Sequence, residues 1–143
     1  GELWDIEIRL VSADIEIGAS FGQAIHRVQI TCPSDLEGSY SYVSTATNGS
    51  PGFWNGSGVV TLTSINATTY ELSDYANGAF GSPTPMSIDD TCETISEGAP
   101  DTSTGAIQSG SVDPSTGVIT INFVLTCCGG NDGDTWTYVM TPQ

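Results

Sequence analysis

The first residues that could do chemistry form the run GASFG at residues 18–22, which has the G-x-S-x-G spacing of a serine nucleophile. His26, the one histidine of the chain, follows shortly after it. In hydrolases this motif needs a turn from a strand into a helix above a parallel sheet, and the triad histidine normally comes last. No alternation of strands and helices surrounds the run here. We interpret it as a flexible hairpin loop without a catalytic serine.

Carboxylates are abundant, with 17 Asp and Glu residues in the chain. A glycosidase needs two carboxyl groups about 5–9 Å apart in a cleft. Spacing along the sequence does not supply that distance, and the chain has no long loops of the kind that build such clefts. We therefore interpret most carboxylates as a solvated acidic surface and predict that the protein is not an enzyme.

A short oxygen-rich turn near the C-terminus is a candidate calcium site, with Asn131, Asp132 and Asp134 as its ligands. Calcium takes six to eight oxygen ligands from carboxylates and carbonyls. The turn lacks the spacing and the distal glutamate of an EF-hand. A second acidic cluster consists of Asp89, Asp90 and Glu93. The alternative interpretation is that these residues only favour turns, and we predict no cofactor beyond a structural calcium.

One loop carries large aromatic side chains among Gly, Ser and Pro residues. Trp54 follows Phe53 there, between Gly52 and Asn55. An exposed aromatic side chain in a polar loop is typical of a binding surface. An indole can stack on a sugar ring while amides bond to its hydroxyls, and the predicted ligand-binding residues are Trp54, Phe53, Asn48 and Asn55. In the alternative interpretation, Trp54 covers one end of a barrel or sandwich.

The four cysteines are Cys32, Cys92, Cys127 and Cys128. No C-x-x-C pair occurs, so two disulfides in an oxidising compartment are favoured over a zinc site. Cys127 and Cys128 would point to opposite faces of a strand, so we expect them to pair with Cys32 and Cys92. A bond between the two neighbours themselves would need a strained peptide.

Composition and charge exclude several classes of partner. Two basic residues against 17 acidic ones give a formal net charge of −15, which argues against nucleic acid and against anionic membrane surfaces. No apolar run approaches the roughly 18 residues that span a bilayer, and no signal peptide is visible. Cations or neutral, hydroxyl-rich molecules remain as natural small partners.

The hydrophobic pattern has period two over most of the chain, which is typical of half-buried strands. It predicts strands at residues 3–10, 24–31, 38–43, 59–65, 69–75, 106–112, 118–127 and 136–140, while residues 86–95 stay ambiguous. Trp4 and Trp136 fall on apolar in-strand positions and are predicted to lie in the core. Asn66-Ala67-Thr68 and the run DPSTG at 113–117 are predicted turns. The fold class predicted is all-β, an antiparallel β-sandwich or meandering β-barrel of seven to nine strands.

The segments 35–40, 60–62, 69–75, 78–80 and 112–121 together have a familiar order of strands and turns. This order resembles the C-terminal β domain of Bacteroidetes-type surface lipoproteins that accompany Sus-like glycan uptake systems. The resemblance covers about three quarters of the chain. It implies a cell-surface or extracellular location and glycan binding, although the adjacent cysteines are not part of it and no lipobox is present.

Two domains follow from this interpretation. Residues 1–33 form an N-terminal β-hairpin, either the closing strands of an immunoglobulin-like module or part of the same core, and residues 34–143 form the antiparallel β domain. The predicted function is that of a non-catalytic extracellular module that binds glycan. The alternative is a structural or adhesive module that contacts a neighbouring surface protein, with residues 3–10 pairing with the sheet edge of another chain.

Overall fold

The structure is a computed structural model, and it describes residues 35–98, 104–127 and 129–143. The predicted hairpin at 1–33, with Trp4, His26 and Cys32, lies outside the described residues. Eight strands and two short helical segments follow one another in the order β1 (Gly38–Asn48), α1 (Pro51–Trp54), β2 (Gly56–Ser64), β3 (Thr69–Leu72), β4 (Met86–Thr91), β5 (Thr94–Glu97), β6 (Gly105–Val112), β7 (Ile119–Leu125), η1 (Gly129–Asn131) and β8 (Thr135–Pro142).

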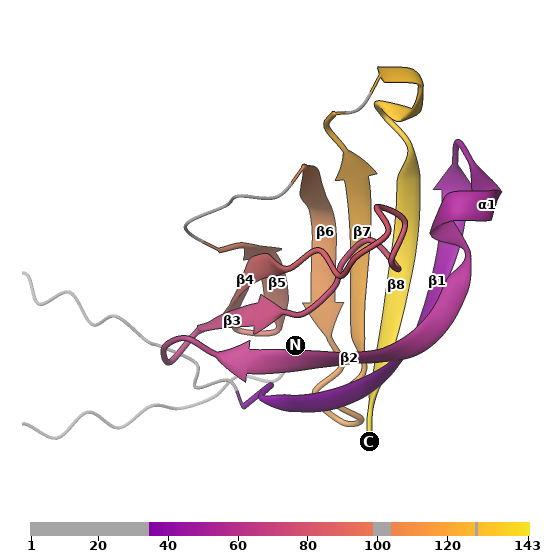
Figure 1. Ribbon diagram of the computed structural model, residues 1–143. Coiled ribbons are helices and arrows are strands. Elements are labelled where there is room, and N and C mark those ends of the chain that lie inside the picture. The colour runs from indigo at the N-terminus through magenta and orange to yellow at the C-terminus, as the bar shows by residue number, and fades with distance from the viewer. Residues whose placement is uncertain (1–34, 99–103, 128) are drawn as a thin grey trace, which may run out of the picture.

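The eight strands form one closed antiparallel barrel in which each strand pairs with its neighbours in the sequence (Figure 1). Closure comes from β1 and β8, which pair from Tyr40 opposite Pro142 to Asn48 opposite Thr135. The ladder between β5 and β6 is short, with the single pair of Thr94 and Ser111. The all-β prediction of seven to nine strands is therefore confirmed, and of its two architectures the meandering barrel is the one that forms.

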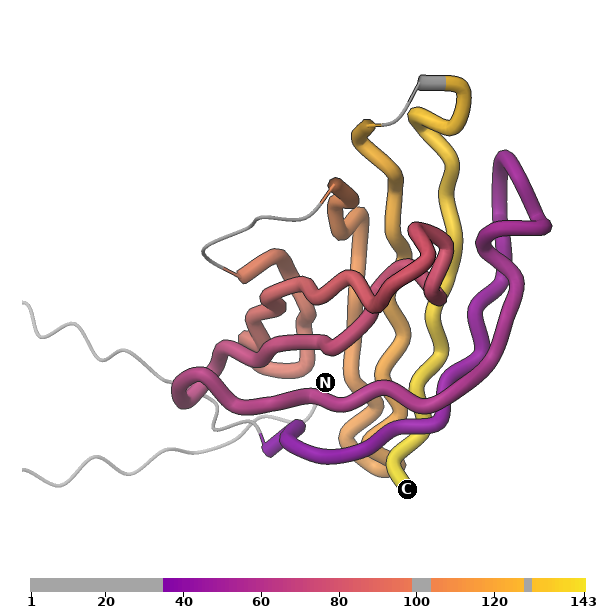
Figure 2. The backbone as a smooth tube through the Cα atoms, in the orientation of Figure 1, coloured from indigo at the N-terminus to yellow at the C-terminus, as the bar shows by residue number. Residues whose placement is uncertain are grey.

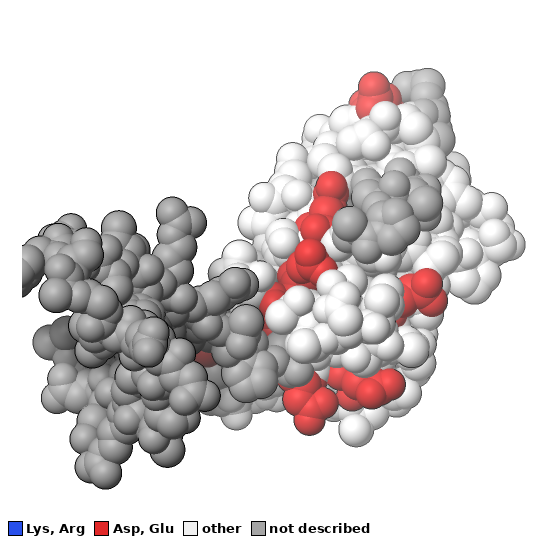
Figure 3. Space-filling view, turned by 90° about the vertical axis from the view of Figure 1, so that its left-hand side faces the viewer, with Lys and Arg blue, Asp and Glu red and all other residues white. Residues whose placement is uncertain are grey.

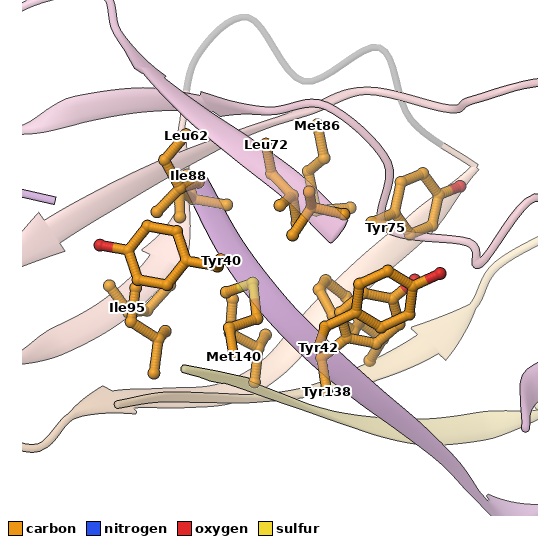
Figure 4. Close-up of a cluster of buried hydrophobic side chains, with 14 of the residues drawn as sticks. Tyr40, Tyr42, Leu62, Leu72, Tyr75, Met86, Ile88, Ile95, Tyr138 and Met140 are labelled. Atoms are coloured by element: carbon orange, nitrogen blue, oxygen red, sulfur yellow. The ribbon is translucent and has the colours of Figure 1, made fainter. Parts of the chain in front are cut away.

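Period-two alternation explains the strands, because it places one side chain in two inside the barrel. β7 alternates strictly, with Ile119, Ile121, Phe123 and Leu125 buried and the residues between them half-exposed. Trp136 and Tyr138 of β8 are buried in the same way, as predicted for Trp136. Figure 4 shows side chains from β1, β2, β3, β4, β5 and β8 filling the interior together.

Aromatic rings form a stacked column inside the barrel. Trp54 stacks on Trp136 with ring centroids 4.1 Å apart, and Trp136 stacks in turn on Phe123 at 5.4 Å. Phe123 contacts Tyr138 edge-on, and Tyr138 stacks on Tyr42 at 4.7 Å. Offset and edge-on aromatic pairs contribute about 0.5–1.5 kcal/mol each beyond the area they bury. The column therefore ties β1, β7 and β8 to α1.

Two turns show how the chain reverses between strands. In the predicted turn at 113–117, Asp113 Oδ1 accepts hydrogen bonds from the amide and hydroxyl of Ser115, at 2.9 and 2.7 Å. These bonds lower the pKa of Asp113, and Gly117 takes a φ of +69°. The ambiguous stretch 86–95 is a hairpin of β4 and β5, whose turn places Cys92 and Glu93 at φ of +52° and +69°. Without glycine at these positions, the sequence carried no clear turn signal.

The barrel has two ends, which the backbone trace in Figure 2 makes easy to follow. At the upper end β7 finishes and β8 begins, and at the lower end β6 turns into β7. Leu36 is buried at the lower end, where its carbonyl accepts a 2.9 Å hydrogen bond from the Tyr40 hydroxyl. Its amide donates to the Tyr70 hydroxyl at 3.4 Å. The start of the described chain is thereby fastened to the lower end.

Candidate functional site

Two connections meet at the upper end of the barrel, and together we call them the upper rim: residues 49–55, which contain α1, and residues 74–81. Asp74 holds the second connection in shape, because its carboxylate accepts hydrogen bonds from the amides of Ala76 at 3.0 Å and Gly78 at 2.7 Å. The Tyr75 carbonyl accepts a 3.0 Å bond from Trp136 Nε1 inside the barrel. The upper rim is thus anchored to the core.

Trp54 lies inside the barrel mouth, which corrects the prediction that it is an exposed loop aromatic. Its side chain is 1% exposed, and its indole stacks on Trp136. The Trp54 carbonyl also accepts a hydrogen bond from the buried Ser44 hydroxyl. The four-residue helix α1 turns the ring inward, so Trp54 covers one end of the barrel, as in the alternative interpretation. It is not available to stack on a sugar in this conformation.

Asp134 is the polar partner of Trp54, and it joins the two sites that the sequence kept separate. Its Oδ2 accepts a 2.8 Å hydrogen bond from Trp54 Nε1 and a 3.1 Å bond from the Ser50 amide. The Ser50 hydroxyl contacts Asn131 Oδ1 at 3.3 Å. At Gly49, with a φ of +93°, any Cβ would lie 1.8 Å from Asp134 Oδ1. Glycine at position 49 therefore makes room for the buried Asp134 carboxylate, whose hydrogen-bond donors are the Trp54 indole and the Ser50 amide.

The structure distributes the predicted calcium ligands over different environments. Asp134 is buried and bonded to Trp54, whereas Asp132 is exposed. In the second acidic cluster, Asp89 accepts a 2.5 Å hydrogen bond from the Thr69 hydroxyl, and Asp90 points into the barrel interior. Within the described ranges, no three His, Cys, Asp or Glu residues form a group that could hold a metal ion. The calcium site stays a prediction.

Two phenylalanine rings stay exposed on the upper rim. Phe53 is 49% exposed and Phe80 is 43% exposed. Phe53 precedes the buried Trp54, and Phe80 meets Trp54 edge-on with ring centroids 6.2 Å apart. The sequence analysis missed Phe80, although it is a large apolar side chain in a polar loop, the same signal that singled out Trp54.

Asn77 clamps the two connections of the upper rim together. Its amide nitrogen donates to the carbonyls of Asn55 at 3.3 Å and Phe53 at 3.5 Å. Its Oδ1 accepts a 2.6 Å bond from the Tyr42 hydroxyl inside the barrel. Asn77 adopts a φ of +53°, which asparagine tolerates better than most residues. These contacts hold Phe53 and the 74–81 connection in one rim.

The two asparagines predicted to bind ligand differ in how many of their side-chain hydrogen-bonding groups are already used. Asn55 is exposed, and its Oδ1 accepts a 2.7 Å bond from the Ala46 amide, which leaves the amide NH₂ for another partner. Asn48 is exposed at the end of β1, opposite Thr135. Within the described part of the chain its side chain makes no hydrogen bond, so both its donor and its acceptor are free.

Burial changes the acid–base properties of three tyrosines inside the barrel. Burial, followed by the nearby Tyr42 and Asp74, raises the pKa of Tyr138 far above its usual value. Burial is also the main cause of the raised pKa values of Tyr42 and Tyr40. These hydroxyls therefore stay protonated to a higher pH than a tyrosine in water does.

The described cysteines lie at opposite ends of the barrel. Cys92 and Cys127 are both disulfide-bonded. Cys92 sits in the lower-end turn, where Val112 donates a 2.9 Å bond to the Glu93 carbonyl. Cys127 follows β7 at the upper end, and β7 spans about 20 Å between the two ends at about 3.4 Å per residue.

This separation bears on which cysteines are bonded. A disulfide needs Cα atoms within about 7 Å, so Cys92 cannot be bonded to Cys127. Cys32 and Cys128 lie outside the described residues. The expected pairing of Cys127 and Cys128 with Cys32 and Cys92 therefore stays a prediction, in which Cys92 and Cys127 are not bonded to each other.

The fold and rim define this part of the chain as an eight-stranded meandering β-barrel whose upper mouth is covered by a tryptophan. No protein-family model, curated protein or solved structure matches the chain. Among the described residues, no helix has the length and apolar character to cross a membrane.

Proposed function

We propose that this protein is a non-catalytic extracellular or cell-surface β-barrel module that binds a neutral glycan at its upper rim. Phe53 and Phe80 provide the stacking surfaces, and Trp54 supports them from below. The observation that carries the proposal is the presence of two half-exposed aromatic rings on one rim that Asn77 clamps to the barrel.

Stacking on sugars suits this arrangement because a pyranose face carries polarised C–H groups that pack against an aromatic ring. The edge-on contact of Phe80 with the buried Trp54 restricts the Phe80 ring, which lowers the entropy lost on binding. The exposed side chain of Asn48 and the free amide NH₂ of Asn55 offer hydrogen bonds to hydroxyls nearby.

Charge supports a neutral ligand over an anionic one. The chain has a formal net charge of −15, and its two basic residues, Arg9 and Arg27, lie outside the described part. Anionic polysaccharides would therefore be repelled, whereas neutral hydroxyl-rich polymers would not. The disulfide-bonded state of Cys92 and Cys127 supports an oxidising, extracellular compartment.

The proposal is tested by affinity electrophoresis in gels that contain neutral or anionic polysaccharides, followed by calorimetry with oligosaccharides of the best binder. Phe53→Ala and Phe80→Ala each remove one ring and are expected to weaken binding about three- to tenfold. The double variant should abolish detectable retardation. Asn48→Ala should weaken binding less, since it removes a neutral hydrogen bond.

Ile65→Ala is the matched control, because Ile65 is similarly exposed but lies beyond β2 at the β2–β3 turn. It should bind like the unmodified protein. Far-UV circular dichroism confirms that each variant is folded. The proposal fails if the unmodified protein binds none of the neutral polysaccharides, or if the folded double variant binds as well as the unmodified protein.

A further inference from the structure

The outward faces of the strands divide the barrel into an acidic side and a side without charge. On the acidic side, Glu71 of β3 and Asp89 of β4 face outward, and Glu97 is exposed at the end of β5. Figure 3 shows acidic side chains gathered on the face that lies on the left in Figure 1. β1, β2, β7 and β8 contain no charged residue at all.

The uncharged strands lie across the barrel from the acidic ones. In a closed ring of eight strands in sequence order, β1 and β8 stand opposite β5 and β4. The outward positions of β1, β2, β7 and β8 are occupied by serine, threonine, valine and asparagine. No charged side chain on this face has to lose its hydration when a neutral surface binds there, although the chain as a whole is strongly acidic.

Three exposed valines lie at the centre of this uncharged side, and we call the surface around them the valine face: Val43 of β1, Val59 of β2 and Val139 of β8. Their side chains are 57%, 60% and 40% exposed. Val43 pairs directly with Val139 in the β1–β8 ladder, and Val59, opposite Ser41, is its diagonal neighbour in the β1–β2 ladder. Directly opposed side chains on neighbouring strands touch, so the valines form one apolar patch.

We propose that the valine face is the contact surface between two copies of this chain. β1 and β8 pair with each other, so copies cannot join through the edges of these strands and have to meet through an outward face. A cationic partner would favour the acidic side instead. A second copy presents the same uncharged surface, and a two-fold axis would bring each valine patch onto the other.

Electrostatics favours this arrangement over contacts that bring the acidic side of one copy against the other. Opposite walls of a sheet structure are about 10 Å apart, so face-to-face contact leaves the two acidic sides about 30 Å from each other. The Debye length at physiological ionic strength is about 8 Å. The repulsion that remains is long-range and screened by salt, whereas the contact itself contains no ion pair that salt would weaken.

The size of the face predicts a weak dimer. Four strands spaced about 4.8 Å apart and about 25 Å long cover roughly 500 Å² on each copy, but these strands curve around half of a closed barrel and cannot all reach the partner. Both copies together would therefore bury less than about 1,000 Å², which is typical of weak interfaces. The dimer should therefore be reversible and depend on protein concentration. This inference uses β1, β2 and β8, and does not depend on glycan binding at the upper rim.

Sedimentation velocity on the full chain, over a range of concentrations and from about 50 mM to about 500 mM NaCl, tests the proposal. A monomer–dimer equilibrium that strengthens with salt is expected. Val43→Glu and Val139→Glu place a charge in the centre of the face and should weaken association at least tenfold. Ile65→Glu adds the same charge at an exposed position outside the face and should associate like the unmodified protein.

Two results would overturn the proposal. One is a protein that stays monomeric at every concentration and salt, which would mean that the valine face does not join two copies of this chain. The other is a dimer that Val43→Glu and Val139→Glu leave unchanged, which would place the contact elsewhere. Thermal unfolding of each variant verifies that the added charge has not unfolded the barrel.

Discussion

The hydrogen bond between Trp54 and Asp134 should hold the upper mouth of the barrel closed, and Trp54→Phe tests this. The substitution keeps an aromatic ring against Trp136 but removes the Nε1 donor that lies 2.8 Å from Asp134 Oδ2. Hydrogen bonds to charged groups contribute about 1.5–3 kcal/mol. Asp134 is buried and would keep only the Ser50 amide as a donor. We expect the free energy of unfolding in urea to fall by about 2–3 kcal/mol.

Trp136→Phe is a matched control in the same column of rings. Its Nε1 donates at 3.0 Å to the carbonyl of Tyr75, which is neutral, so its hydrogen bond should contribute about 0.5–1.5 kcal/mol. Both substitutions remove the same atoms, and we expect the larger loss for Trp54→Phe because its acceptor is a carboxylate.

A double-mutant cycle with Asp134→Ala completes the test, and unfolding is followed by far-UV circular dichroism. We expect a coupling energy of about 1.5 kcal/mol between Trp54 and Asp134. A coupling energy below about 0.5 kcal/mol would refute the reasoning, because the two groups would then stabilise the rim independently.

Two further predictions concern pH and the cysteines. The pKa of Tyr138 is raised in the folded state, so the folded protein holds this proton to a higher pH than the unfolded chain does. The resulting contribution to stability is complete below about pH 10 and is lost as the pH rises further. Phenolate absorbance should show Tyr138 ionising only together with unfolding, and ionisation of Tyr138 in the folded state would contradict the prediction. Mass spectrometry of unreduced peptides should find Cys92 and Cys127 each in a disulfide but not linked to each other, whereas a peptide that joins Cys92 to Cys127 would contradict the strand register.

The alternation of apolar and polar residues determined most of the strands without any knowledge of the tertiary structure. In β7, the buried Ile119 and Phe123 and the half-exposed Asn122 follow directly from period two. The turn at 113–117 was also predictable, because Asp113 and Gly117 use local side-chain and backbone properties. These features depend on neighbours within a few residues, which sequence patterns record.

The inward direction of Trp54 was decided by contacts between residues far apart in the chain. α1 has four residues, which is too short for a periodic pattern to show which side faces the core. Its indole turns inward because Trp136 offers a ring and Asp134 an acceptor, both about 80 residues later in the sequence. The same loop composition therefore fits an exposed platform and a buried cover equally well.

Barrel closure and the division of charge also depended on the tertiary structure. A sandwich and a barrel share the same alternating strands, and only the pairing of β1 with β8 distinguishes them. That pairing places the uncharged strands from both ends of the described chain side by side and leaves β3, β4 and β5 opposite them. The sequence by itself determined which side chains alternate and how acidic the chain is. Only the closed sheet decided which exposed residues share a face, because that depends on long-range register.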